Sequence, residues 1–150
     1  MSCEAPLIIA AVAFPAVLFL LWIRRKYLKY CDEMERIDGL KWQCAQKKRW
    51  IAEILRNFDL FFGNGSRGTI SFNVRTKAEF ALSLVDGMAL EDKVREYKRL
   101  YDMLYETWDR AERDPVNVSA IVSPLNTFCS EISQRRIDDI RKIMNEETEK

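Results

Sequence analysis

Few side chains in this sequence are of the types that carry out chemistry. Histidine, the commonest general base and metal ligand, is absent from the 150 residues. The four cysteines, at positions 3, 31, 44 and 129, form no CxxC pair and show no metal-ligand spacing. They are typical of free thiols in a reducing compartment. These observations predict a protein that is not an enzyme and that uses no metal and no cofactor.

The segment GNGSRGT at 63–69 is the clearest candidate for a ligand-binding loop. Three glycines in six residues would let the backbone approach a phosphate, but the spacing is neither that of a Walker motif nor GxGxxG. A flexible turn between two elements is the simpler interpretation. The alternative is a membrane-tethered enzyme or ligand-binding sensor. Its site would combine the loop with nearby basic residues and a tyrosine-rich stretch, namely Lys48, Arg49, Arg67 and 97–105.

The overall charge argues against nucleic acid as a partner. Lysine and arginine total 24 and aspartate and glutamate total 23, which gives a formal net charge of +1. Proteins that bind nucleic acid usually carry a marked basic excess. The short basic cluster at 47–49 lies in a stretch of mixed charge. A solvated helix face is therefore the better interpretation of that cluster.

One apolar stretch near the N-terminus organises the rest of the chain. Residues 5–23 read APLIIAAVAFPAVLFLLWI, nineteen positions without a charge. As a helix they would extend about 28 Å, roughly the thickness of a bilayer core. The preceding MSCE has no lysine or arginine, whereas a cleaved signal peptide begins with a basic segment. We therefore expect an uncleaved transmembrane helix at 5–23, between a short outside head at 1–4 and a helical domain at 24–150.

The flanks of the apolar stretch predict its orientation. Glu4 precedes it, and four basic residues follow within six positions. By the positive-inside rule, the head faces outward and residues 24–150 lie on the cytoplasmic or matrix side. A mitochondrial or bacterial inner membrane fits this orientation, whereas the opposite one would fit a phage or viral lysis protein. The residues expected at the membrane interface, against lipid, are Trp22, Arg24, Arg25, Lys26, Tyr27, Lys29 and Tyr30.

The domain after the span begins with the pattern of an amphipathic helix. No proline interrupts 24–62, and apolar side chains recur there at intervals of three and four residues. This predicts one helix that is continuous with the membrane span. Lys41 and Lys48 lie on the same stripe and argue against a coiled-coil dimer. Another kind of homo-oligomer remains compatible with the sequence.

The rest of the chain predicts further long helices. Alternation at 70–74 allows a short extended piece, and a capping box at 76–79 predicts a helix start. Gly87 should interrupt that helix, and a second stripe at 90–111 ends at an Asp-Pro pair. Ser-Pro at 123–124 predicts the start of the last helix, with an apolar face of Leu125, Phe128, Ile132, Ile140 and Met144. The predicted fold is all-α, with a single N-terminal transmembrane helix that continues into a bundle of three to four long helices.

Aromatic residues are the candidates for contacts with a partner. Trp42 and Trp50 lie eight residues apart on a second face of the first long helix. Packing on neighbouring helices is a simpler role for these two than stacking on a ligand. Tyrosines and a tryptophan follow at helical spacing in the second stripe. The predicted partner contacts are Trp42, Trp50, Tyr97, Tyr101 and Trp108.

A spaced set of residues between 80 and 120 matches a known pattern. The matching positions are Phe80, Glu91, Val94, Lys98, Tyr101, Asp102, Tyr105, Trp108, Asp109, Pro115, Asn117 and Ala120. In this set the stretch resembles the LemA family, whose pattern runs F-…-E-x-x-I-…-R-x-x-Y-N-…-V-x-x-Y-N-…-P-x-N-x-x-A. Both Tyr-Asn pairs are altered here, a one-residue gap precedes the proline, and the family's W…RR-x-x-L-I-P segment has no clean counterpart after position 24. The resemblance implies a membrane helix with a short outside head and a cytosolic helical bundle, without a settled activity or catalytic residues.

The anchor, the helical stripes and the four tryptophans favour a structural or interaction protein. We expect an accessory subunit of a larger inner-membrane complex, such as a respiratory-chain or ATP synthase assembly. Its partners would be membrane lipid and the other subunits. The alternatives are a membrane-tethered LemA-like protein of unknown activity and the ligand-binding sensor that uses the loop at 63–69.

Overall fold

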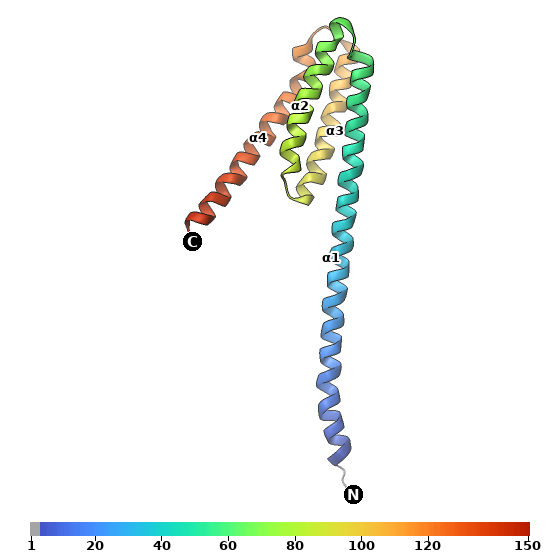
Figure 1. Cartoon of the computed structure of the whole chain (residues 1–150), viewed down its shortest axis with the longest axis vertical. Helices are drawn as coiled ribbons and strands as arrows, with labels where there is room; N and C mark the ends of the chain where they lie inside the picture. Colours follow the sequence, from blue (N-terminus) through green and yellow to red (C-terminus); the bar gives the residue numbers. More distant parts are fainter. Residues whose placement is uncertain (1–3) are drawn as a thin grey trace. The chain divides into compact units, whose positions relative to one another are not determined.

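The structure is a computed structural model that describes residues 4–150, so residues 1–3 of the predicted head at 1–4 lie outside the described residues. The described chain consists of helices without strands, which confirms the predicted all-α class for this part of the chain. It divides into two compact units, Met1–Gly39 and Leu40–Lys150. In chain order the elements are α1 (Glu4–Phe62), the short 3-10 helix η1 (Gly65–Arg67), α2 (Gly68–Asp86), α3 (Leu90–Arg113) and α4 (Val118–Thr148) (Figure 1).

The first unit contains the N-terminal part of α1, which is long and apolar enough to cross a membrane. The large apolar side chains from Leu7 to Ile23 are 42–69% exposed. An apolar surface of this kind is favourable against hydrocarbon and unfavourable against water. Pro15 lies inside the helix, a position that membrane helices tolerate better than soluble ones. The N-terminal part of α1 is thus a candidate membrane span.

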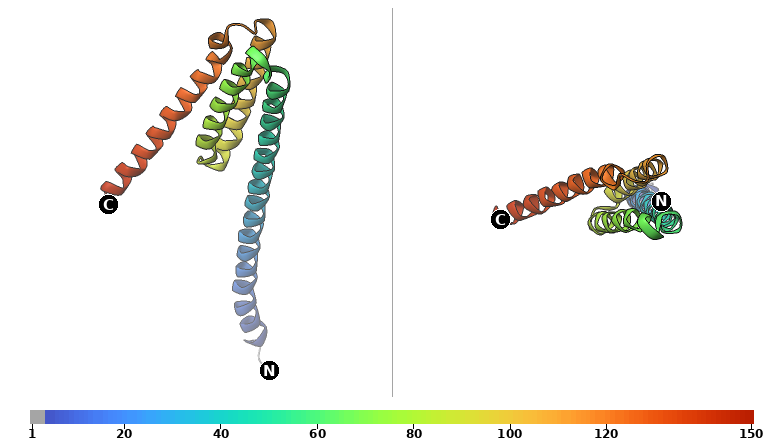
Figure 2. Two further views of the ribbon diagram at one scale, coloured as in Figure 1. Left: turned by 45° about the horizontal axis from the view of Figure 1, so that its top comes forward. Right: turned by 90° about the horizontal axis from the view of Figure 1, so that it is seen from above.

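The second unit is a bundle of α2, α3, α4 and the later part of α1. The face of α1 that enters the core carries Ile51, Leu55, Phe58 and Phe62, at successive steps of four, three and four. α2 and α3 lie side by side, and the first part of α4 packs against both (Figure 2). These helices share one apolar core, whose buried members include Ile70, Val74, Ala78, Ala81, Leu100, Leu104, Leu125, Phe128 and Ile132.

α2 begins ahead of the helix start predicted at 76–79, and the stretch 70–74 is helical rather than extended. Both predictions are therefore wrong. Ile70 and Val74 are fully buried and lie one helical turn apart, so helix rather than strand lets both face the core. Thr76 lies inside the helix, where its hydroxyl donates to the carbonyl one turn earlier at 2.8 Å. The free energy gained by burying the turn that contains Ile70 and Val74 therefore outweighs the preference of the capping box for a helix start at 76–79.

α4 also begins before its predicted start at 123–124, so that prediction is wrong too. The side-chain oxygen of Asn117 caps the helix by accepting from the backbone N–H of Ala120 at 3.2 Å. Pro124 therefore lies inside α4, where it has no N–H to donate to the carbonyl of Ala120. Arg110 of α3 donates to that carbonyl at 3.1 Å. α3 thus supplies the hydrogen bond that the proline removes.

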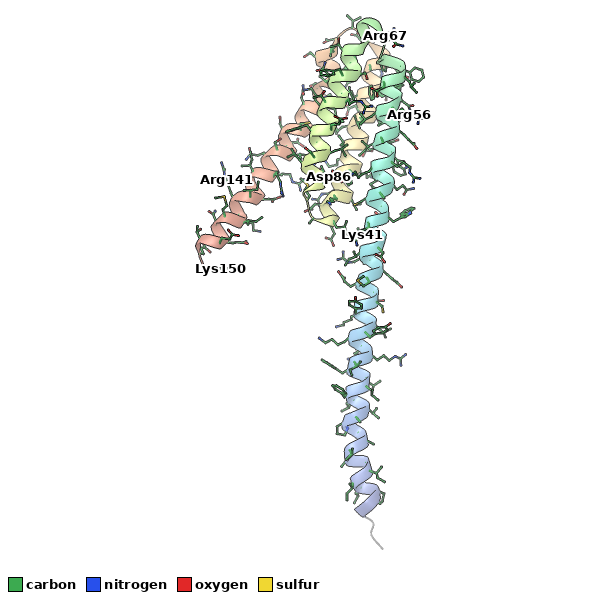
Figure 3. The ribbon with its side chains drawn as sticks, viewed as in Figure 1. Lys41, Arg56, Arg67, Asp86, Arg141 and Lys150 are labelled. Carbon is green, nitrogen blue, oxygen red and sulfur yellow. The ribbon has the colours of Figure 1, made fainter. Side chains whose placement is uncertain are left out.

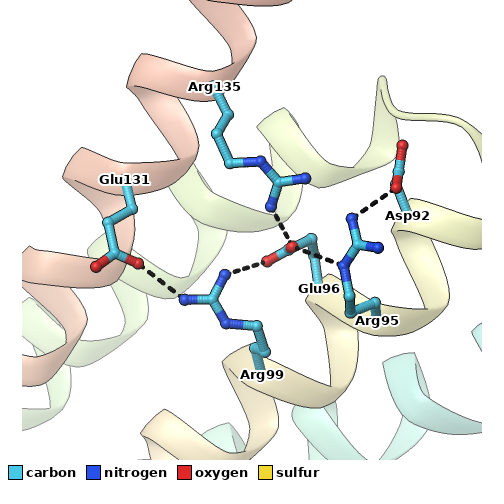
Figure 4. A network of polar contacts seen from close by, with 6 residues as sticks. All are labelled: Asp92, Arg95, Glu96, Arg99, Glu131 and Arg135. Atoms are coloured by element: carbon cyan, nitrogen blue, oxygen red, sulfur yellow. Dashed lines mark hydrogen bonds and ion pairs between the residues drawn. The ribbon is translucent and has the colours of Figure 1, made fainter.

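A buried carboxylate joins α3 to α4 (Figure 4). Glu96 is 0% exposed and accepts hydrogen bonds from Arg95 (3.4 Å), Arg99 (3.0 Å) and Arg135 of α4. Arg99 also donates to Glu131 of α4 at 2.8 Å. The hydrogen bond to Glu96 raises the pKa of Arg135. Because a charge is tolerated in a core only when it is paired and hydrogen-bonded, this cluster ties α4 to one position along α3.

A second polar cluster joins the end of α1 to the start of α2. Asp59 accepts hydrogen bonds from the guanidinium of Arg75 and from the hydroxyl of Ser71. The hydrogen bond from Arg75 holds the pKa of the Asp59 carboxyl below its usual range, and the one from Ser71 adds to it. Gly63 follows α1, and a Cβ at this position would lie 2.0 Å from the carbonyl oxygen of Asp59. The connection between the two helices is tight and requires glycine there.

Cys31, Cys44 and Cys129 are free thiols in the described part of the chain. Burial raises the pKa of the Cys44 thiol and that of the Cys129 thiol. The Cys129 thiol also donates to the carbonyl of Lys77 at 3.4 Å. A raised pKa leaves a smaller fraction of thiolate at a given pH, and the thiolate is the reactive form. These two cysteines are therefore packing residues of the core.

We expect iodoacetamide at pH 7.5 to alkylate Cys44 at least about tenfold more slowly than the half-buried Cys31 in the folded protein, because Cys44 is buried and its pKa is raised. Cys129 is as exposed as Cys31, and its raised pKa should make it the slower of these two. Peptide-resolved mass spectrometry over a time course measures the three rates. In urea the three rates should converge. Equal rates in the folded protein would contradict the burial of Cys44 and the raised pKa of both thiols.

Candidate functional site

Aromatic side chains from α1 and α3 line a groove in the second unit. The lining residues of each helix are spaced three or four positions apart, so those of α1 lie on one face of α1 and those of α3 on one face of α3. The volume of the groove is about 380 Å³, which is in the range of small binding sites. It is lined by Trp50, Glu53, Ile54, Asn57, Tyr101, Tyr105 and Trp108.

Trp108 forms the fixed end of this aromatic groove. Phe58, Phe61 and Phe62 of α1 meet its ring edge-on, with centroid distances of 5.0, 5.4 and 5.2 Å. Edge-to-face pairs are a preferred geometry for aromatic rings and add stability beyond the buried area. The indole N–H donates to Glu112 at 2.9 Å. The orientation of Trp108 is thus determined by the fold before anything binds.

The other end of the aromatic groove is more open. Trp50 is 38% exposed and Tyr105 is 55% exposed. The centroid of Trp50 lies 5.7 Å from that of Tyr101, which in turn lies 6.4 Å from that of Tyr105. The ammonium of Lys47 lies 5.5 Å from the centroid of the Trp50 ring. The rings therefore form a row along the groove with faces that a ligand can reach.

The aromatic groove also contains polar groups without partners. The carboxylate of Glu53, the amide of Asn57 and the hydroxyls of Tyr101 and Tyr105 make no hydrogen bond or ion pair among the described residues. In the part of the chain that the structure describes, neither arginine nor lysine lines it. An aromatic surface with unused acceptors is suited to non-covalent recognition. Nothing in this set of side chains supplies a nucleophile with an adjacent base.

The structure brings together three of the five predicted partner contacts, Trp50, Tyr101 and Trp108, in the aromatic groove. Trp42 is 62% exposed and does not line it. Tyr97 is 2% exposed and belongs to the core, where its hydroxyl donates to Asp86. Burial raises the pKa of Tyr97, and the hydrogen bond to Asp86 adds to this effect.

The residues predicted at the membrane interface all lie on α1 in the first unit. The three aromatic residues among them, Trp22, Tyr27 and Tyr30, are 55–64% exposed. The ammonium of Lys26 lies 5.3 Å from the centroid of the Trp22 ring. Trp22 also stacks on Phe19, with centroids 6.0 Å apart. These contacts are local to one helix, and the role of this segment at a membrane remains a prediction.

The glycine-rich segment at 63–69 holds the 3-10 turn η1 and the first two residues of α2. Gly65 has φ +64°, a left-handed conformation that glycine adopts without strain. Lys48 is not near this segment, because it pairs at 3.3 Å with Asp86 at the far end of α2. Figure 3 shows Arg67 and Asp86 at these opposite ends. Lys48 and Arg67, two of the three basic residues predicted for a sensor site, are therefore separated.

The predicted partner contacts leave out four residues of the aromatic groove, namely Glu53, Ile54, Asn57 and Tyr105, of which Tyr105 was predicted only as part of the sensor stretch 97–105. Their spacing from Trp50 and Tyr101 was available as a signal, because residues three and four apart share a helix face. Within the described residues, no group of three or more His, Cys, Asp or Glu could hold a metal ion. Comparison with protein families, curated proteins and solved structures finds no match to this chain.

Proposed function

We propose that this protein is a membrane-anchored helical interaction protein whose aromatic groove docks a partner. The observation that carries the proposal is the groove itself, in which aromatic rings are held in place by the fold while polar groups remain without partners. Protein–protein interfaces are enriched in tryptophan and tyrosine, because these side chains bury a large area while losing little conformational entropy. The most specific form of the proposal is an accessory subunit of an inner-membrane complex, such as a respiratory-chain or ATP synthase assembly.

The N-terminal part of α1 supports the membrane half of this proposal. Its apolar side chains are exposed, and four basic residues follow the apolar run within six positions. We propose the N-terminus outside and the second unit on the cytoplasmic or matrix side of a mitochondrial or bacterial inner membrane, by the positive-inside rule. A LemA-like protein of unknown activity would share this anchor and bundle. The sensor alternative has less support, since Lys48 lies away from the loop at 63–69.

The test is blue-native electrophoresis after extraction in a mild non-ionic detergent. We expect the protein to migrate in an assembly larger than its own 17.7 kDa, and the double substitution Trp50→Ala and Tyr105→Ala to release it from that assembly. Both side chains are part exposed, so their loss should leave the fold intact. Trp42→Ala is the matched control, because Trp42 is exposed outside the groove. Migration of the unaltered protein as a lone monomer would contradict the proposal.

A further inference from the structure

We propose that the aromatic groove receives an arginine side chain. The inference rests on the proposed function in one respect only, since the arginine is taken to come from the docked partner protein. It concerns the chemistry of the occupant: a planar, positively charged guanidinium that lies against the rings and donates hydrogen bonds to the free acceptors of the groove.

The aromatic rings provide the first part of the argument. A cation is attracted to the negative face of an aromatic ring, with tryptophan the strongest of the three aromatic types. Four such rings, those of Trp50, Tyr101, Tyr105 and Trp108, line this one groove. The Lys47 ammonium lies 5.5 Å from the centroid of Trp50, which shows that a cation can lie against this row of rings and that one face of Trp50 is already taken. Tyr105, which is 55% exposed, offers its ring to a cation from outside the chain.

The carboxylate of Glu53 provides the second part. It lines the groove, belongs to an exposed residue and has no hydrogen-bond or ion-pair partner among the described residues. Among the described residues, no lysine or arginine lines the groove to neutralise it. The carboxylate of Glu112, beside Trp108, already accepts from the indole N–H of that residue. Glu53 is thus the free negative charge of the groove, and it is complementary to a cationic occupant.

The number and kind of free polar groups favour arginine over other cations. The guanidinium has five N–H donors in one plane and no acceptor. The groove provides acceptors at Glu53, at the amide oxygen of Asn57 and at the hydroxyls of Tyr101 and Tyr105. A guanidinium also stacks on aromatic faces, whereas an ammonium is a compact and strongly hydrated point charge. Quaternary ammonium groups have no N–H and would leave these acceptors unpaired.

The experiment compares two probes of nearly the same shape on the full chain in maltoside micelles. N-acetyl-arginine methylamide carries the guanidinium, and N-acetyl-citrulline methylamide replaces it with a neutral urea. Their binding is followed through the indole N–H resonances of Trp50 and Trp108 by NMR. We expect arginine to shift these resonances saturably and citrulline to bind at least about fivefold more weakly, as loss of a part-exposed cation–π contact and ion pair implies. A non-ionic detergent is required, because choline headgroups would compete.

Glu53→Gln should reduce the affinity for the arginine probe about fivefold, and Glu146→Gln, in an exposed turn of α4, should leave it unchanged. Saturable binding that depends on the charge of the probe and on Glu53 supports the inference. Equal binding of arginine and citrulline, or no saturable shift at Trp50 and Trp108, overturns it. If the groove substitutions still release the protein from its assembly in that case, the docking role stands and its occupant is neutral.

Discussion

Replacement of Glu96 by alanine is expected to lower the free energy of unfolding of the second unit by about 1–3 kcal/mol, because the carboxylate is buried whereas the three arginines left without it are 39–56% exposed. The side chain is 0% exposed and is the common acceptor of Arg95, Arg99 and Arg135. Its removal leaves three guanidinium groups close together without their shared counter-charge. Urea titration of the full chain in maltoside micelles, followed by circular dichroism, measures the change.

The control for this substitution is Glu131→Gln. Glu131 pairs with Arg99 at 2.8 Å, but its side chain is 51% exposed. An exposed ion pair contributes about 0–1 kcal/mol. The free energy of unfolding of the control should therefore be close to that of the unaltered protein. Similar losses for the two substitutions would mean that burial of Glu96 does not determine its contribution.

Gly63→Ala is expected to lower the free energy of unfolding by about 3 kcal/mol, the upper end of the usual cost of forcing an extra methyl into a packed site. The added Cβ would lie 2.0 Å from the carbonyl oxygen of Asp59. Because backbone is the atom in conflict, the chain between α1 and α2 has to move. That movement would also displace the Asp59 carboxylate from Ser71 and Arg75.

The same measurement on Gly39→Ala provides the comparison for Gly63→Ala. Gly39 lies inside α1, and apart from the adjacent backbone of the helix itself no described atom would lie within 4 Å of a Cβ there. Alanine is favoured over glycine in a helix interior by about 0.5–1 kcal/mol. Gly39→Ala should therefore be neutral or stabilising in the same urea titration. Two glycine substitutions with the same outcome would show that contact with Asp59 is not the cause.

The sequence predicted the helical class because its signals were periodic and long. Stripes at intervals of three and four identified the core-facing side of α1 and the stretch that became α3, and Asp-Pro after the second stripe coincides with the end of α3 at Arg113. Helix starts were less predictable. The capping box at 76–79 and the Ser-Pro pair at 123–124 are valid local signals, but tertiary burial of Ile70 and a cap at Asn117 extended both helices beyond them.

The candidate site was only partly accessible from the sequence. Periodicity selected Trp50, Tyr101 and Trp108 as aromatic residues of interest, and they share the groove. It also selected Tyr97, one turn before Tyr101, which the structure places in the core. The side of α3 that faces α1 depends on how the two helices are paired and rotated. That information belongs to the packed bundle and is absent from the pattern of either helix alone.

The end of α4 has a different physical character from its beginning. Every residue after Arg136 is exposed, although the helix continues to Thr148 and extends past α2 and α3 (Figures 1 and 2). A segment as exposed as this one gains little stability from packing and depends mainly on its local hydrogen bonds, which are marginal in water at this length. Turns around Leu125 and Ile132 should open only when the bundle unfolds, and turns around Met144 by fraying. Within this one helix, the amide hydrogens near the beginning should therefore exchange with solvent only at the rate of global unfolding. Those near the end should exchange almost freely.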